Sequence, residues 1–125
     1  MIKILIVDDS NFSQRITANL VKKFLDDVDV YFANDGQEGL EAYKKINPDY
    51  AFVDLLMPNM SGKDMIELIK KFRNDAKIIV ASSDVQKSVK EDIEGLGIMA
   101  FVNKPFNEEK AKLVFDMIRN DLNLI

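Results

Sequence analysis

Five short apolar segments rich in β-branched residues alternate with five longer segments of helical spacing, and this alternation constrains the fold more than any other feature. The strand-like segments are Lys3–Val7, Val28–Ala33, Tyr50–Asp54, Lys77–Ala81 and Met99–Asn103. The helix-like segments are Asn11–Leu25, Gly36–Ile46, Gly62–Phe72, Val85–Leu96 and Glu108–Leu122. Such alternation predicts an α/β fold, with a doubly wound parallel sheet, right-handed crossovers and helices on both faces. No linker or repeat interrupts the pattern, so we expect one domain over residues 1–125.

The ends of several predicted helices carry suitable capping residues. Asp35, Ser61 and Asn107 stand directly before helix-like segments and can accept hydrogen bonds from the first turn. Gly97 follows the fourth helix-like segment and suits a helix C-terminus. These signals support the proposed boundaries.

Composition excludes several classes of site. The chain has no cysteine and no histidine, which removes disulfides, thiolate zinc sites, Ser-His-Asp catalysis and imidazole metal sites. The net charge is −4 and the basic residues are scattered, so we expect no nucleic-acid partner. No apolar run is long enough to cross a membrane, and the N-terminus lacks the layout of a signal peptide. We therefore expect a cytoplasmic protein without a membrane partner.

Polar side chains stand at the C-terminal ends of the predicted strands. In strand order, these residues are Asp8 and Asp9, Asn34 and Asp35, Asp54, Ser82 and Ser83, and Lys104. Ligands of open parallel sheets bind at this edge, near the point where the strand order reverses. If the first and third strands are neighbours, three carboxylates, a hydroxyl group and an ammonium group converge there.

Three clustered carboxylates require a cation. At about 5 Å and an effective dielectric constant of about 20, one like-charged pair costs roughly 3 kcal/mol. Oxygen ligands favour a hard ion such as Mg²⁺, Mn²⁺ or Ca²⁺. Lys104 and Ser82 could balance the charge of a phosphoryl group, and Asp54 could attack its phosphorus to form an acyl phosphate. Asp54 is the best nucleophile candidate because it comes from a different strand than the Asp8–Asp9 pair.

Four motifs together resemble the response-regulator receiver family, whose fold is CheY-like. They are "VDDS", "VDLLMPNMSG", "VASS" and "NKPF", and each follows a different predicted strand in the family's order. The resemblance covers the whole chain and implies the strand order 2-1-3-4-5.

The resemblance assigns a role to each candidate residue of the site. Asp54 is similar to the phosphorylated aspartate, and Asp8 and Asp9 to the acidic pair of the Mg²⁺ site, with Asp9 the more direct ligand and Mn²⁺ a substitute ion. Leu56 would offer its backbone carbonyl to the metal. Lys104 would pair with the phosphate, and a cis peptide bond to Pro105 is expected. Ser82 and Phe101 resemble the hydroxyl and the aromatic ring that switch on phosphorylation.

The resemblance also implies a signalling function. A sensor histidine kinase or a histidine phosphotransfer protein would donate the phosphoryl group, and a downstream protein effector would receive the signal. The chain would catalyse only its own phosphorylation and dephosphorylation, so it is not expected to be a dedicated enzyme. It ends after the fifth helix, which predicts that no output domain is attached.

Three surface features are relevant to partners. The fourth helix has one thin apolar stripe, Val85, Val89, Ile93 and Leu96, which favours a moving part. In the last helix Leu113, Met117 and the nearby Leu124 lie off the core stripe. They are either scattered surface residues or a partner-docking face, and our hypothesis is the docking face. Phe12 either helps to dock the phosphodonor protein or packs locally.

Three other functions are consistent with parts of the pattern. A Mg²⁺-dependent phosphohydrolase would need a second acid near Asp54, and "DLLMP" supplies none. A flavin-binding flavodoxin-like protein would need a phosphate loop rich in Ser, Thr and Gly, whereas "DDSN" would repel phosphate. A receiver-like domain that works without phosphorylation is disfavoured by the complete set of acids, hydroxyl and lysine.

Overall fold

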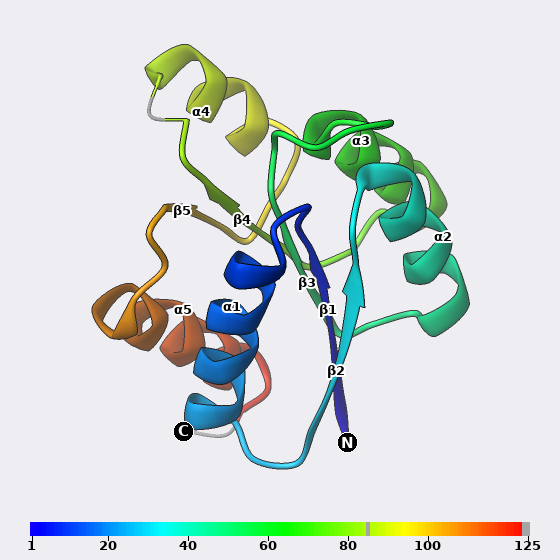
Figure 1. Cartoon of the computed structure of the whole chain (residues 1–125). Helices are drawn as coiled ribbons and strands as arrows, with labels where there is room; N and C mark the ends of the chain where they lie inside the picture. The colour runs from blue at the N-terminus through cyan, green and yellow to red at the C-terminus, as the bar shows by residue number, and fades with distance from the viewer. Residues whose placement is uncertain (85, 124–125) are drawn as a thin grey trace.

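A single parallel sheet of five strands forms the centre of the molecule (Figure 1). The computed structural model describes residues 1–84 and 86–123. The strands are β1 (Ile2–Val7), β2 (Val28–Ala33), β3 (Tyr50–Val53), β4 (Ile78–Ser82) and β5 (Ala100–Asn103). Their order is β2-β1-β3-β4-β5 and every pair is parallel, which confirms the predicted fold class. Because β1 and β3 are neighbours, their C-terminal ends meet.

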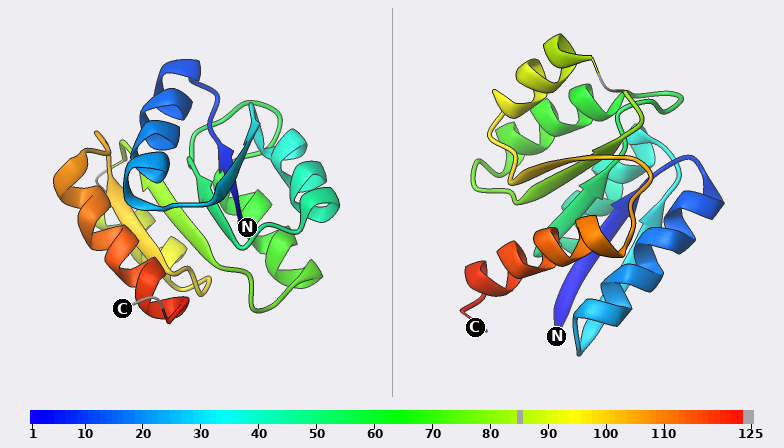
Figure 2. Two further views of the ribbon diagram at one scale, coloured as in Figure 1. Left: turned by 90° about the horizontal axis from the view of Figure 1, so that it is seen from below. Right: turned by 90° about the vertical axis from the view of Figure 1, so that its left-hand side faces the viewer.

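Helices cover both faces of the sheet (Figure 2). They are α1 (Asn11–Phe24), α2 (Gly36–Ile46), α3 (Gly62–Phe72), α4 (Lys87–Glu94) and α5 (Glu108–Asp121). The buried side chains of α1 and α5 pack with Ile4 and Ile6 on one face, and those of α2, α3 and α4 pack with Leu5 and Val7 on the other. Because successive side chains of β1 point to opposite faces of the sheet, they contribute to two separate hydrophobic cores. Among the described residues no helix is long and apolar enough to cross a membrane.

The N-termini of four helices are capped by a side-chain oxygen. Asp35, Ser61 and Asn107 each accept a hydrogen bond from the backbone N–H three residues on, which confirms the predicted caps. Ser10, the residue after Asp9, does the same for α1, which starts at Asn11. The Ser10 cap therefore sets the start of α1 directly behind the acidic pair.

The fourth helix is shorter than predicted. It spans Lys87–Glu94, and the predicted starting residue Val85 lies outside the described residues. Gly95 caps its C-terminus, and Gly97 has a positive φ of 82°, so the two glycines end the helix before Leu96. Its only buried residue is Ile93, which confirms the thin apolar contact. The other strand and helix ends differ from the predicted ends by no more than one residue.

Candidate functional site

The ends of β1 and β3 bring three carboxylates together. Val7 is paired with Val53 in the sheet, so Asp8 and Asp54 follow at the same level, and the Asp54 N–H donates to the Val7 carbonyl oxygen at 3.0 Å. One carboxylate oxygen each from Asp8, Asp9 and Asp54 lies within 4.8 Å of the others. The predicted convergence of the three acids is therefore present in the structure.

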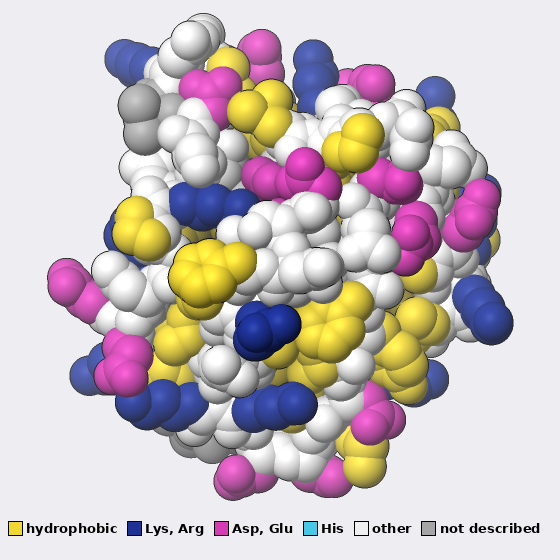
Figure 3. All heavy atoms as spheres, viewed as in Figure 1, with side chains coloured by type: hydrophobic (Ala, Val, Ile, Leu, Met, Phe, Trp, Pro, Cys, Tyr) yellow, Lys and Arg dark blue, Asp and Glu magenta, His cyan; other side chains and the backbone are white. Residues whose placement is uncertain are grey.

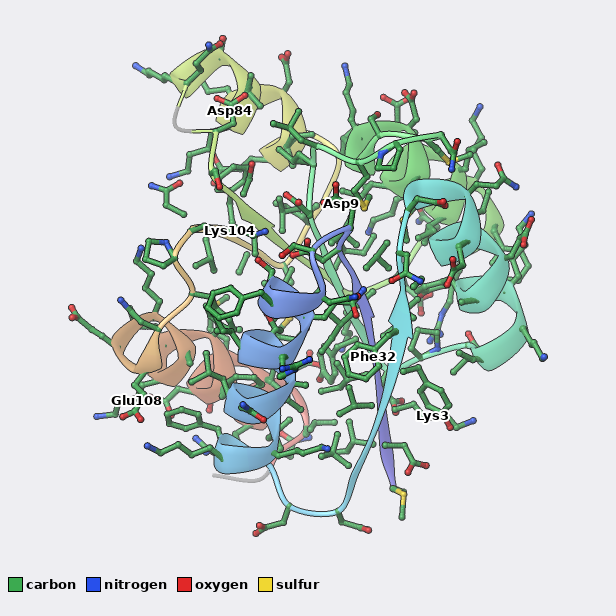
Figure 4. All side chains as sticks on the ribbon, viewed as in Figure 1. Lys3, Asp9, Phe32, Asp84, Lys104 and Glu108 are labelled. Atoms are coloured by element: carbon green, nitrogen blue, oxygen red, sulfur yellow. The ribbon has the colours of Figure 1, made fainter. Side chains whose placement is uncertain are left out.

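Lys104 reaches this cluster from the end of β5. Its Nζ lies 2.8 Å from Asp8 Oδ2 and 3.5 Å from Asp54 Oδ2. Its backbone N–H donates to the carbonyl oxygen of Ser82, which ties it to the end of β4. The peptide bond between Lys104 and Pro105 is cis, as expected. Figure 4 shows Lys104 and Asp9 on opposite sides above the first turn of α1.

Burial strengthens the electrostatics of the cluster. Asp8 is 4% exposed and Asp54 9%. Burial raises the pKa of Asp54, the charge of Asp8 raises it further, and the charge of Lys104 opposes both effects. Burial alone would lower the pKa of Lys104, but its hydrogen bond to Asp8 and the charge of Asp54 outweigh that effect and raise it. Lys104 is thus the counterion of two buried acids.

The donor set of the cluster suits a hard divalent cation. All three candidate ligands are carboxylates, and Asp9 is exposed, which leaves an open side for water and phosphate oxygens. Figure 3, viewed as in Figure 1, shows acidic side chains side by side just above the centre of the molecule. The side chain of Leu56 is 67% exposed on the loop after β3, and its backbone carbonyl stays a predicted ligand.

The two predicted switch residues lie on β4 and β5. Ser82 is fully buried, and its hydroxyl oxygen accepts a hydrogen bond from the Asp84 N–H at 3.1 Å. Phe101 is half-buried, and the Lys90 ammonium of α4 lies 5.9 Å from the centre of its ring. Phe101 therefore contacts the helix that is least firmly packed.

Two hollows lie beside the predicted partner residues. Leu113 (66% exposed) and Met117 (41% exposed) line one of about 260 Å³ together with Phe101. Phe12, 73% exposed, lines another of about 310 Å³ with Lys104 and neighbouring residues. Local packing therefore does not bury Phe12. Leu124 lies outside the described residues.

One polar residue behind the acidic pair, Gln14, was not predicted from the sequence pattern. Gln14 is 8% exposed, and its Nε2 donates to the backbone oxygen of Asp8 at 2.7 Å and to Asn34 Oδ1 at 2.9 Å. The available signal was its position on α1, since it shares a face with the buried residues Thr17, Ala18 and Val21. An amide on a core-facing stripe needs buried partners.

Comparison with known proteins places the chain in a family. Residues 4–116 match the family model of the response regulator receiver domain. The chemotaxis protein CheY of Thermotoga maritima is 34% identical over 109 residues, which cover 87% of this chain and 90% of that protein. A protein-glutamate methylesterase/protein-glutamine glutaminase of the same organism is 33% identical over 132 residues, covering 99% of this chain but only 38% of that protein.

A solved structure agrees over nearly the same extent. The crystal structure of the CheX-CheY-BeF₃-Mg²⁺ complex from Borrelia burgdorferi contains a chain that superposes with a TM-score of 0.84 at 25% identity. The match covers 97% of this chain and 89% of that one. With the sheet order, the acids after β1 and β3 and the lysine after β5, these matches show that the chain belongs to the response regulator receiver domains, the phosphoacceptor domains of two-component signalling.

Proposed function

We propose that Asp54 accepts a phosphoryl group from a phosphohistidine of a sensor histidine kinase or histidine phosphotransfer protein. A carboxylate oxygen of Asp54 bonds to phosphorus, the P–N bond to the imidazole breaks, and the departing imidazole takes up a proton. The observation that carries this proposal is the position of the Asp54 carboxylate, which lies beside Lys104 and within 4.8 Å of Asp8 and Asp9. The proposed receiver domain extends over residues 1–125.

The other residues of the cluster would prepare Asp54 for this transfer. Asp9, Asp8, Asp54 and the Leu56 carbonyl would hold Mg²⁺, for which Mn²⁺ can substitute. The bound ion neutralises charge on the phosphoryl oxygens. Lys104 would exchange part of its contact with Asp8 for a phosphoryl oxygen. The Borrelia burgdorferi complex, which contains beryllofluoride and magnesium with a CheY chain, supports this assignment.

Phosphorylation would move the signal from Asp54 to α4. The Ser82 hydroxyl, which pairs with the Asp84 N–H in this structure, would turn to the phosphoryl group. Phe101 would then repack behind it. A hollow of about 320 Å³ between α4 and the loop after β3 gives the helix room to shift, and a single buried side chain, Ile93, holds it.

Amide hydrogen exchange measures this shift. Beryllofluoride with Mg²⁺ is expected to change exchange in α4 and β5 at least severalfold while that of α2 stays constant, because α4 is the least buried helix. The same reagents should leave exchange in Asp54→Asn unaltered. Equal changes in all helices would point to general stabilisation instead of a switch.

The output would pass through a protein partner. Phe101, Leu113 and Met117 line one hollow, so a change in Phe101 alters the surface that the other two residues offer to a downstream effector. Phe12 would contact the phosphodonor protein, since it is exposed beside Lys104. The chain would catalyse only its own phosphorylation and dephosphorylation.

Intact mass after incubation with Mg²⁺ and a small phosphodonor tests the acceptor. The wild-type protein and Asp26→Asn, which removes an exposed acid from the α1–β2 loop, are expected to gain one phosphoryl group. Asp54→Asn is expected to gain none. An unchanged adduct in Asp54→Asn would refute the assignment, and continuous release of phosphate without an adduct would favour the phosphohydrolase.

A further inference from the structure

The peptide group between Asp8 and Asp9 is held by a buried side chain of α1. Gln14 Nε2 donates to the Asp8 carbonyl oxygen at 2.7 Å. The backbone N–H of Asp8 donates to the Ala33 carbonyl oxygen at 3.1 Å. Rotation of the Asp8–Asp9 peptide would break the Gln14 contact, so Gln14 fixes the direction in which the chain enters Asp9.

Asp9 depends on this backbone support more than Asp8 does. The Asp8 carboxylate has its own partners, since Oδ1 accepts from the Ser10 N–H at 3.0 Å and Oδ2 from Lys104. The exposed Asp9 carboxylate accepts no hydrogen bond from any residue that the structure describes. The placement of Asp9 therefore comes from the backbone alone.

The Gln14 amide is itself held by the end of β2. Besides the Asp8 carbonyl, it donates to Asn34 Oδ1 at 2.9 Å and is 3.3 Å from the Ala33 carbonyl oxygen. All these partners are acceptors, so only a donor fits the position. An amide with two N–H groups that is shared among them has little freedom to turn.

We propose that Gln14 is a positioning residue of the metal site. By fixing the Asp8–Asp9 peptide it holds the Asp9 carboxylate near those of Asp8 and Asp54 before the cation arrives. This inference rests on the proposed function of the acidic cluster as a Mg²⁺ site. Groups that orient metal ligands in this way commonly change metal affinity by about 10- to 100-fold when they are removed.

The magnesium affinity of matched variants tests the proposal. Gln14→Met keeps the length and removes the donor, and calorimetric titration is expected to show Mg²⁺ binding weakened about tenfold. Thr17→Val, one turn further along the buried face of α1, removes a hydroxyl group that makes no hydrogen bond with Asp8 in the described part of the chain, and is expected to leave the affinity unchanged. A Gln14→Met protein that is less stable but binds Mg²⁺ like the wild type would overturn the proposal.

A double-mutant cycle with the exposed Asn34 distinguishes loss of the Gln14 hydrogen-bond network from a general folding defect. Asn34→Ala removes one acceptor of the Gln14 amide and is expected to weaken Mg²⁺ binding about two- to threefold. In the Gln14→Met background it is expected to cause no further loss, because residues of one network do not act additively. Independent effects would contradict the proposed route through Gln14.

Hydrogen exchange of the metal-free protein separates this inference from the proposed function. The Asp8 and Ser10 amides are expected to exchange faster in Gln14→Met than in Thr17→Val, since the loop loses its anchor. If the wild type does not bind Mg²⁺, the metal site of the proposed function fails, while faster exchange would still show that Gln14 holds the loop. Unchanged exchange of both amides would refute the positioning role.

Discussion

Magnesium at about a hundredfold excess over its dissociation constant is expected to raise the Tm of the wild-type protein by about 10 °C, and Asp9→Asn to abolish this rise. A ligand that binds only the folded state stabilises it by about 2.7 kcal/mol at that excess. For a chain of 125 residues, each kcal/mol corresponds to about 4 °C. Asp9 carries the effect because it is the exposed member of the cluster, where the ion can enter.

The metal-free Asp9→Asn protein is expected to melt no lower than the wild type. The substitution removes one of three mutually repelling carboxylates and breaks no hydrogen bond among the described residues. Scanning calorimetry with Mg²⁺, with Mn²⁺ and with a chelator measures both effects. Asp26→Asn is the matched control, because it changes the charge equally and lies in the α1–β2 loop, which Figure 1 shows at the opposite end of the sheet. An undiminished rise with Mg²⁺ in Asp9→Asn would show that the ion binds elsewhere.

The strand positions and the polar residues at their ends were predictable because they depend on local pattern, whereas the strand order came from the family resemblance. Ile4, Leu5, Ile6 and Val7 are all buried, as an apolar run in a doubly covered parallel sheet must be. Parallel strands have their C-terminal ends at one edge, and the order implied by the resemblance puts β1 beside β3, so Asp8, Asp54 and Lys104 were expected to meet there. The α4 boundary was harder, because Gly95 and Gly97 compete with a weak apolar stripe to set it.

Interactions that depend on side-chain geometry were not predictable. The preference of Lys104 for Asp8 over Asp54 rests on a difference between 2.8 and 3.5 Å, which no sequence pattern encodes. Gln14 was missed because two of its three partners are the backbone oxygens of Asp8 and Ala33, and any residue type could supply those. The residues that form the cluster can thus be predicted from the strand ends, whereas the side chains that hold them in place, such as Gln14, depend on tertiary structure.

Lys104→Met is expected to lower the free energy of unfolding by roughly 3 kcal/mol at neutral pH, since removing one partner leaves buried charge uncompensated. Lys104 is the counterion of Asp8 and Asp54, and its side chain is only 18% exposed. Its charge lowers the pKa of Asp54, so without it a pKa already raised by burial rises further. A carboxyl group whose folded pKa is raised destabilises the fold most above that pKa, and this penalty declines as the pH falls from the raised pKa towards the ordinary value.

The difference in unfolding free energy between Lys104→Met and the wild type should therefore be largest at neutral pH and shrink as the pH falls through the raised pKa of Asp54. Mg²⁺ should stabilise the variant more than the wild type, because the ion supplies positive charge to the carboxylates that Lys104 neutralised. Denaturant titrations across pH, with and without Mg²⁺, measure both effects, and Lys112→Met serves as an exposed control on α5. If the loss of unfolding free energy in Lys104→Met depended on neither pH nor Mg²⁺, Lys104 would act through packing alone. The contribution of a counterion must change when its partners are protonated and when a second cation binds them.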